Sequence, residues 1–125
     1  MQPPPLQQRF FHIPDNISIP WQMWFTLISD LWADKIVSVT DDYTSSLSDR
    51  TILCDASLGN ITVTLLEAVK CKGKRYTIKK TDVSANTVTI DANGTETIDD
   101  ALTIVLTDRY ESVTLECSGT AWWIV

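Results

Sequence analysis

The spacing of apolar and polar residues changes once along the chain, at about residue 35. From there to the C-terminus apolar residues alternate with polar ones and many are β-branched, a pattern typical of half-buried strands. It predicts eight short strands, at residues 36–40, 51–54, 61–65, 76–80, 87–90, 103–106, 112–116 and 121–125. With the turn residues between them, they predict a mainly β domain over 36–125, a small antiparallel β-sandwich or barrel-like domain rather than a parallel α/β sheet.

Two of the connections between these strands have sequences that predict a particular local structure. Asn93-Gly94 is the clearest turn signal, because a type I′ hairpin turn needs positive φ at both central residues. Residues 65–69, Leu-Leu-Glu-Ala-Val, are also compatible with a short helical turn. We therefore expect a tight hairpin at the first position and leave strand and helical turn open at the second.

Before residue 35 the apolar spacing is that of a helix. Ser18 is a suitable N-cap and Pro20 is tolerated in a first turn, so we predict one amphipathic helix over 18–35. Its apolar residues recur at spacings of three and four: Ile17, Trp21, Trp24, Phe25, Ile28, Leu31 and Trp32. Such a helix could pack on the β domain as ordinary core, or associate with copies of itself or with a second protein. The width and aromatic content of its apolar face favour association.

Residues 1–17 are expected to form an extended arm. Pro3, Pro4, Pro5 and Pro14 favour polyproline-like backbone over a packed core. The arm nevertheless carries apolar side chains, including Phe10-Phe11. Apolar side chains on an extended segment are typical of a docking peptide.

Two adjacent tryptophans lie near the C-terminus. Trp122 and Trp123 are neighbours on the last predicted strand, where successive side chains face opposite sides of a sheet. One ring is therefore expected in the core, and the other outside it or against a neighbouring subunit. An outward ring would also suit stacking on a sugar.

Composition and charge narrow the class of protein. A chain of 125 residues is the length of one domain with a short appendage, and 44% hydrophobic with 21% charged residues is a globular composition. The net charge of −6 opposes binding to nucleic acid or to anionic lipid. Neither a membrane span nor a secretory signal is expected from the sequence, so synthesis in a cytoplasm is predicted.

The basic residues are concentrated in one part of the chain. Six of the ten lie between Lys70 and Lys80: Lys70, Lys72, Lys74, Arg75, Lys79 and Lys80. The simpler interpretation is that they lie on solvated faces and pair partly with acids across the sheet. The alternative is a positive patch for an acidic partner or a polysaccharide, formed by Lys70, Lys72, Lys74 and Arg75.

Residues that could perform catalysis or hold a metal are few. The only histidine, His12, lies in the arm, where no scaffold would fix it beside a nucleophile. Asp41-Asp42 and Asp99-Asp100 are interpreted as solvated turns. Residues 91–96 are similar to half a calcium loop, but a hairpin turn is preferred over an opportunistic cation, because the twelve-residue spacing is missing. We therefore expect no enzyme activity, no metal and no cofactor.

The three cysteines show no metal-ligand spacing. Cys54, Cys71 and Cys117 all lie in predicted strands or at strand edges, and their number is odd. They are expected to be buried free thiols, which indicates a reducing place of synthesis.

Several segments of the β region resemble a known module. Residues 73–84 fit the pattern G-K-x-Y-x-I-K-K-x-D-x-S, followed by V-T-I at 88–90, E-T-I-D at 96–99 and a terminal G-T-x-W at 119–122. Over about residues 50–125 the chain thus resembles a β module recurrent in tail-fibre, head-fibre and related appendage proteins of tailed bacteriophages. The three prolines and residues 17–25 are also similar to the N-termini of small phage structural proteins, in which an arm and a short helix precede such a module.

This resemblance implies a structural virion protein without catalytic residues, often a homotrimer, attached to the head, neck or tail by its N-terminus. The chain would be a fibre or fibre-adaptor subunit, with the β domain displayed outward and other virion proteins as partners. The expected anchor and oligomer contact comprises Phe10, Phe11, Ile13, Trp21, Trp24, Phe25 and Ile28. A host-surface carbohydrate-binding adhesin module is the alternative function.

Overall fold

The computed structural model describes residues 35–125, which form nine strands and one short 3-10 helix. In chain order these are β1 (Lys35–Val39), β2 (Tyr43–Thr44), β3 (Asp49–Cys54), β4 (Ile61–Thr64), η1 (Ala68–Lys70), β5 (Arg75–Lys80), β6 (Val88–Asp91), β7 (Thr103–Leu106), β8 (Ser112–Cys117) and β9 (Trp122–Ile124). The predicted arm at 1–17 and almost all of the predicted helix at 18–35 lie outside the described residues.

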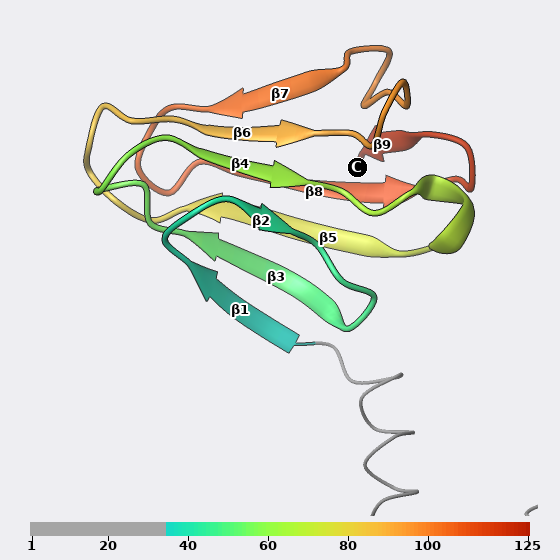
Figure 1. The fold of residues 1–125 in the computed structure, drawn as a ribbon, viewed down its shortest axis with the longest axis horizontal. Helices are drawn as coiled ribbons and strands as arrows, with labels where there is room; N and C mark the ends of the chain where they lie inside the picture. Colours follow the sequence, from blue (N-terminus) through green and yellow to red (C-terminus); the bar gives the residue numbers. More distant parts are fainter. Residues whose placement is uncertain (1–34) are drawn as a thin grey trace, which may run out of the picture. The chain divides into compact units, whose positions relative to one another are not determined.

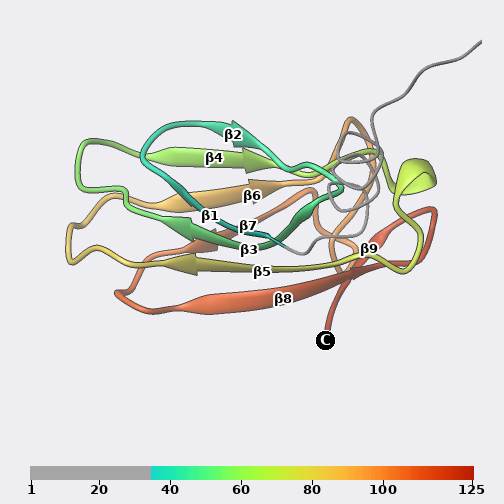
Figure 2. The ribbon, with the colours of Figure 1, turned by 90° about the horizontal axis from the view of Figure 1, so that it is seen from below.

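The strands form two sheets that enclose one hydrophobic core. The five-stranded sheet has the order β1-β3-β5-β8-β9, and the four-stranded sheet has the order β2-β4-β6-β7. Figure 2 shows the sheets as two layers. The buried hydrophobic residues of both sheets belong to a single core cluster, which also includes Ala68 from η1.

From β1 to β6 the chain alternates between the two sheets. Within each sheet these strands are parallel neighbours, β1 with β3 and β3 with β5 in one, β2 with β4 and β4 with β6 in the other. The chain therefore winds as a coil in which every turn adds one strand to each sheet (Figure 1). After β6 the direction reverses, because β7 runs antiparallel to β6, β8 to β5, and β9 to β8.

The mainly β prediction is confirmed, and the two sheets face each other across one core, but the expected antiparallel pairing throughout and the barrel are wrong. Both sheets are mixed, and they do not close into a barrel. The physical reason is that alternation reports only which side of a strand is buried. It is the same for a parallel and an antiparallel strand when one face is in the core. Two parallel neighbours must be joined by a crossover connection. In this fold that connection contains a strand of the opposite sheet.

Apolar side chains, all of them aliphatic except that of Tyr43, stack along the coil at positions that are in register. One ladder in the five-stranded sheet consists of Val37, Ile52, Ile78 and Val113. Two ladders in the four-stranded sheet consist of Ile61, Val88 and Leu106, and of Tyr43, Val63, Ile90 and Ile104. Each buried aliphatic side chain of this kind stabilises the fold by about 1.5–3 kcal/mol relative to its exposed state, so these ladders hold successive turns together.

The type I′ turn lies at a different place from the one expected. Asp99 and Asp100 have φ of 46° and 68°, and the flanking Ile98 and Ala101 exchange two backbone hydrogen bonds of 2.6 and 2.9 Å. This is the arrangement of a type I′ turn, and aspartate tolerates the left-handed region better than most residues. At Asn93-Gly94 only the glycine has positive φ, so the prediction of a type I′ turn there is wrong.

Elsewhere the elements agree with the pattern. All eight predicted strands are present, and no end differs by more than two residues from the predicted one. The helical turn considered for 65–69 is present as η1, which begins at Ala68 and ends at Lys70. β2 is an additional strand of two residues, too short to produce an alternating pattern.

Candidate functional site

The four basic residues proposed to face a partner lie at one corner of the domain, between η1 and the start of β5. The corner is fixed by Glu96, whose Oε1 and Oε2 atoms accept the Ala68 N–H at 3.1 and 3.0 Å at the beginning of η1. Gly73, with φ of 83°, turns the chain into β5 and donates its N–H to Cys117 O at 2.8 Å. Lys70 to Arg75, which we call the basic corner, therefore lies beside the end of β8.

Two of these basic side chains are paired with carboxylates. Lys70 Nζ lies 3.6 Å from Glu67 Oε1, and Arg75 Nη2 lies 3.3 Å from Glu116 Oε2 across the sheet. Both pairs are exposed, and such pairs contribute about 0–1 kcal/mol to stability. Their main effect is on the local charge, because each acid offsets one of the cations that would attract an acidic partner.

The other two lysines contact neighbouring groups. Lys74 Nζ lies 5.3 Å from the ring centroid of Tyr76. The carbon chain of Lys72 runs beside Gly119, where a Cβ would lie 3.4 Å from its Cγ and Cδ atoms. Lys72 is exposed and Lys74 is half-buried. The positive patch for an acidic partner or polysaccharide stays a prediction, and its charge is partly offset by Glu67 and Glu116.

A row of three side chains follows the outer face of the five-stranded sheet from this corner. Arg75, Glu116 and Trp123 are in register on β5, β8 and β9. The indole of Trp123 is 45% exposed, whereas Trp122 is fully buried, so the expected division of the two rings is confirmed. The row, which we call the Arg75–Glu116–Trp123 row, combines an aromatic surface with hydrogen-bond donors and acceptors. Sequence reasoning missed Glu116 because only the strand register brings it there.

Trp122 is part of the core rather than of this row. Its ring packs against that of Tyr76 with centroids 5.5 Å apart. The backbone of Trp122 also pairs with the segment before the Asp99-Asp100 turn, since its N–H donates to Thr97 O at 2.8 Å. This pairing covers the edge of β9 and limits the exposed sheet edge.

Two of the acidic side chains singled out from the sequence connect their turns to neighbouring strands. Asp42 Oδ1 accepts the Thr62 N–H at 2.8 Å, and Asp99 Oδ1 accepts the Ile124 N–H at 3.1 Å. Glu96, the last residue of the segment similar to a calcium loop, is the acid that holds η1. Within residues 35–125 no group of three or more His, Cys, Asp or Glu side chains is arranged to hold a metal ion.

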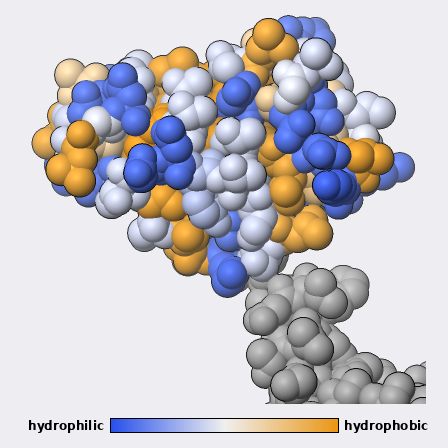
Figure 3. Space-filling view, in the orientation of Figure 1, coloured by the Kyte–Doolittle hydropathy of each residue, from blue (hydrophilic) through white to orange (hydrophobic). Residues whose placement is uncertain are grey.

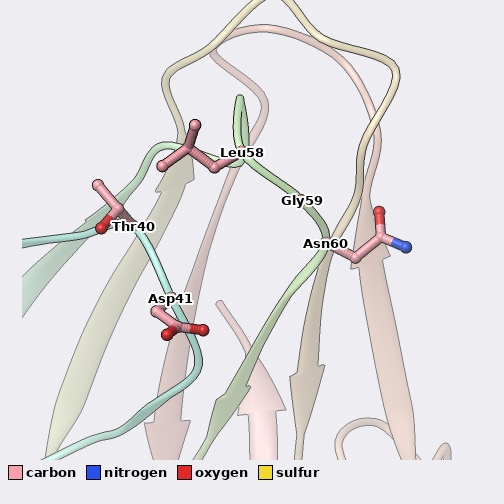
Figure 4. A pocket seen from close by; sticks show the side chains of 5 residues that line it. All are labelled: Thr40, Asp41, Leu58, Gly59 and Asn60. Carbon is pink, nitrogen blue, oxygen red and sulfur yellow. The ribbon is translucent and has the colours of Figure 1, made fainter.

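A surface hollow lies between the β1–β2 and β3–β4 connections. It has a volume of about 270 Å³ and is lined by Thr40, Asp41, Leu58, Gly59 and Asn60. Figure 4 shows the Asn60 amide directed away from Thr40 and Asp41. The Oδ1 atom of Asn60 accepts the Thr87 N–H at 2.9 Å, so this side chain joins two turns of the coil. Few polar groups remain to converge on a ligand, which a specific pocket requires.

One basic residue of the Lys70–Lys80 segment is not on a solvated face. Lys80 is fully buried, and its Nζ donates to Asp82 Oδ2 at 3.0 Å, to Asp82 O at 3.1 Å and to Ser84 O at 3.0 Å. The solvated interpretation is therefore wrong for Lys80. Its alternation with Tyr76 and Ile78, which are both buried, is a signal in the sequence that places it inward.

Asp82 is the centre of this buried network. Its Oδ1 accepts the Ala56 N–H at 2.8 Å, and its Oδ2 accepts the Ser84 N–H at 3.0 Å and the Ser84 hydroxyl. Burial raises the pKa of the Asp82 carboxyl, but the hydrogen bonds from Ser84, Ala56 and Lys80 outweigh it and hold the pKa well below its usual range. The network ties the β5–β6 connection to the preceding turn of the coil and presents no free polar group for chemistry.

Comparisons of the whole chain with protein families, with curated proteins and with solved structures find no match. In the part of the chain that the structure describes, no helix is both long and apolar enough to cross a membrane.

Proposed function

We propose that this chain is a structural virion protein of a tailed bacteriophage, a fibre or fibre-adaptor subunit. Residues 1–17 and 18–35 anchor it to the head, neck or tail, and the β domain at 36–125 is displayed outward. The subunit is a homotrimer, and its partners are other virion proteins. The support comes from the resemblance to phage appendage modules, together with the roles of the resembling residues in this fold.

The first half of the resembling pattern builds the third turn of the coil. Tyr76 and Ile78 are fully buried, and the Tyr76 hydroxyl donates to Ser46 O at 2.7 Å. Lys80, Asp82 and Ser84 are the three side chains of the buried network. These pattern residues therefore interact with the fold itself.

The second half of the resembling pattern holds η1 and the C-terminal strand β9 in place. Glu96 holds η1, Ile98 is fully buried, and Asp99 accepts the Ile124 N–H. Gly119, with φ of 99°, makes the turn that brings the buried Trp122 into the core. The observation that carries the proposal is that the residues of the resemblance are those that hold this coil together. A shared pattern of structural residues favours a shared β module. Such a module favours a structural protein displayed on the particle over an enzyme, because its pattern residues serve the fold and not catalysis.

The proposal is tested by quantifying the chain in purified phage particles from cells that carry its gene. Mass spectrometry should find it in the particles, in a fixed copy number relative to the capsid protein. Light scattering of the purified full-length chain at micromolar concentration should give the mass of a trimer. Its presence only in the lysate, with particles lacking it, would refute the virion assignment, and a monomeric mass would refute the trimer.

A host-surface carbohydrate-binding adhesin is the second candidate, and the Arg75–Glu116–Trp123 row favours it. An exposed indole offers a flat apolar surface to a sugar ring, while the neighbouring carboxylate and guanidinium can exchange hydrogen bonds with its hydroxyls. On the face drawn in Figure 3, hydrophilic and hydrophobic side chains are interspersed, as on many soluble domains.

A glycan array distinguishes the two candidates. The adhesin proposal expects binding by the full-length chain that is lost in Trp123→Ala and retained in Tyr110→Ala. Tyr110 is a suitable control, because its ring is also exposed, at 56%, but lies outside the row. No binding on the array by a chain that still enters particles would support the assembly role and eliminate the adhesin.

A further inference from the structure

Two thiols face each other beneath the basic corner. Cys71 follows η1 and Cys117 ends β8, and their Sγ atoms are 3.6 Å apart. Their exposed fractions are 4% and 2%. Cys54, at the end of β3, is buried too, but within residues 35–125 no other cysteine pair is in contact.

The backbone holds both thiols in this arrangement. Gly73 N donates to Cys117 O at 2.8 Å and Cys117 N donates to Lys74 O at 2.9 Å, so the two segments are joined on either side of the sulfurs. The Cys71 thiol donates to Glu67 O and the Cys117 thiol donates to Ala68 O, each at 3.2 Å. A disulfide needs an S–S distance of about 2.05 Å. The two sulfurs must therefore move closer together than they are in this reduced arrangement.

We propose that Cys71 and Cys117 are a modification site that forms an intramolecular disulfide when the protein meets a small oxidant of the peroxide class. One thiol loses its proton, and the thiolate attacks a peroxide oxygen. An S–O bond forms and the O–O bond breaks, which gives a sulfenic acid and a hydroxide that takes up the released proton as the first water. The second thiol then attacks the sulfenic sulfur, the S–S bond forms, and a second water leaves. The two sulfurs lose two electrons in total, and hydrogen peroxide is reduced to two molecules of water.

Burial makes this reaction slow, because the thiolate is the attacking species and burial raises the pKa of the Cys71 thiol to about 12. The cysteines therefore stay reduced where thiol reductants are present, as at the proposed site of synthesis. Oxidation requires a local opening of η1 and the turn after it, which is a short segment at the surface of the domain.

The cross-link would fix the basic corner to the end of β8. It joins residues 46 positions apart, so it would restrict the unfolded chain considerably. We expect the melting temperature of the oxidised protein to rise by about 5 °C or more. Lys70 to Arg75 would then be held in the arrangement described above, while the fold of the coil is unchanged.

The test uses the full-length chain in native buffer, treated with hydrogen peroxide and afterwards unfolded and alkylated. The expected product has lost two hydrogens, keeps one alkylatable thiol, and yields a cross-linked Cys71–Cys117 peptide. Cys54→Ala should oxidise as the wild type does, whereas Cys71→Ala and Cys117→Ala should each fail to form the intramolecular disulfide. The wild-type peptide map is decisive even if one of these variants folds poorly.

Three results would overturn the proposal. The first is a wild-type chain that keeps all three thiols after prolonged treatment. The second is a disulfide that includes Cys54. The third is conversion of Cys71 or Cys117 to sulfinic or sulfonic acid without a cross-link. None of them bears on whether the chain is a virion protein.

Discussion

Lys80 Nζ lies 3.0 Å from Asp82 Oδ2, and the two side chains are 0% and 5% exposed. A charged pair at this depth loses its hydration, and only close partners compensate for the loss. Here Lys80 has three acceptors, and Asp82 has further donors from Ser84 and Ala56. The network lies where the β5–β6 connection meets the preceding turn, so the stability of the coil depends on it.

Asp82→Asn should therefore destabilise the protein strongly. The substitution keeps the shape of the side chain but leaves the buried Lys80 ammonium without a counter-charge, and removal of one partner of such a pair costs about 3–5 kcal/mol. The free energy of unfolding in urea measures this. Glu116→Gln is the matched control, because it breaks the exposed pair with Arg75 and should cost less than about 1 kcal/mol. Equal effects of the two substitutions would contradict the account.

Stability should fall when the solution becomes acidic. The pKa of Asp82 is lower in the folded protein than its ordinary value of 3.8, so the unfolded chain binds more protons as the pH falls. This contribution is complete above the unfolded value and is lost as the pH drops below it. Glu111 acts in the same direction, because the N–H groups of Thr107 and Asp108 lower its pKa. Urea titrations at a series of acidic pH values should show a smaller slope for Asp82→Asn than for the wild type, and an unchanged slope would argue against the network.

Stability should also fall at alkaline pH. Burial raises the pKa of Tyr76 from 10.0 to about 12, and burial followed by the hydrogen bond to Asp49 raises that of Tyr43 to about 12 as well. Both phenols are therefore protonated in the folded state at a pH where the unfolded chain loses its protons. Their contribution is present below pH 10 and is lost as the pH rises toward 12. Unfolding followed at increasing pH should show this loss, reduced in Tyr43→Phe and in Tyr76→Phe. A stability that stays constant up to pH 12 would be inconsistent with buried phenols.

The turn between Ile98 and Ala101 can be improved. Asp100 has φ of 68°, in the left-handed region that favours glycine, so Asp100→Gly should stabilise the protein by about 0.5–1 kcal/mol. Asp100→Val should do the opposite, because a β-branched residue is strained there. Thermal unfolding of the two variants checks the turn. The reverse order of melting temperatures would show that this turn has a different backbone conformation.

Much of the fold could be predicted from the alternation alone. It located eight of the strands and predicted that one of Trp122 and Trp123 lies in the core, because burial of one face of a strand has a direct signature. The pairing of the strands was not predictable. Val37, Ile52 and Ile78 form one ladder, but the turn of coil between the last two is much longer than the turn between the first two. Without a constant repeat length, the sequence contains no periodic signal of the coil.

The candidate site was predictable to a lesser extent. Trp123 and Arg75 could be named from residue type, but their alignment with Glu116 depends on register. The prediction for Lys80 was wrong because it lies in a cluster of basic residues, which suggested a solvated face. Its position two residues after Ile78 and four after Tyr76 indicated instead that it shares their buried side of the strand. For Lys80, position in the alternating pattern predicted burial better than charge did. The ammonium group can be buried because Asp82 and Ser84 accept its hydrogen bonds.

We propose that residues 1–34 attach the chain to the particle while the β domain is displayed. The direct measurement is the amount of chain in purified particles when the full-length protein, or the protein without residues 1–34, is supplied in trans to a phage lacking the gene. A Lys72→Glu/Lys74→Glu variant with an intact N-terminus serves as the control. We predict that the shortened protein is folded by circular dichroism but absent from the particles, and that the control is incorporated normally. Incorporation of the shortened protein at the full-length level would contradict the account.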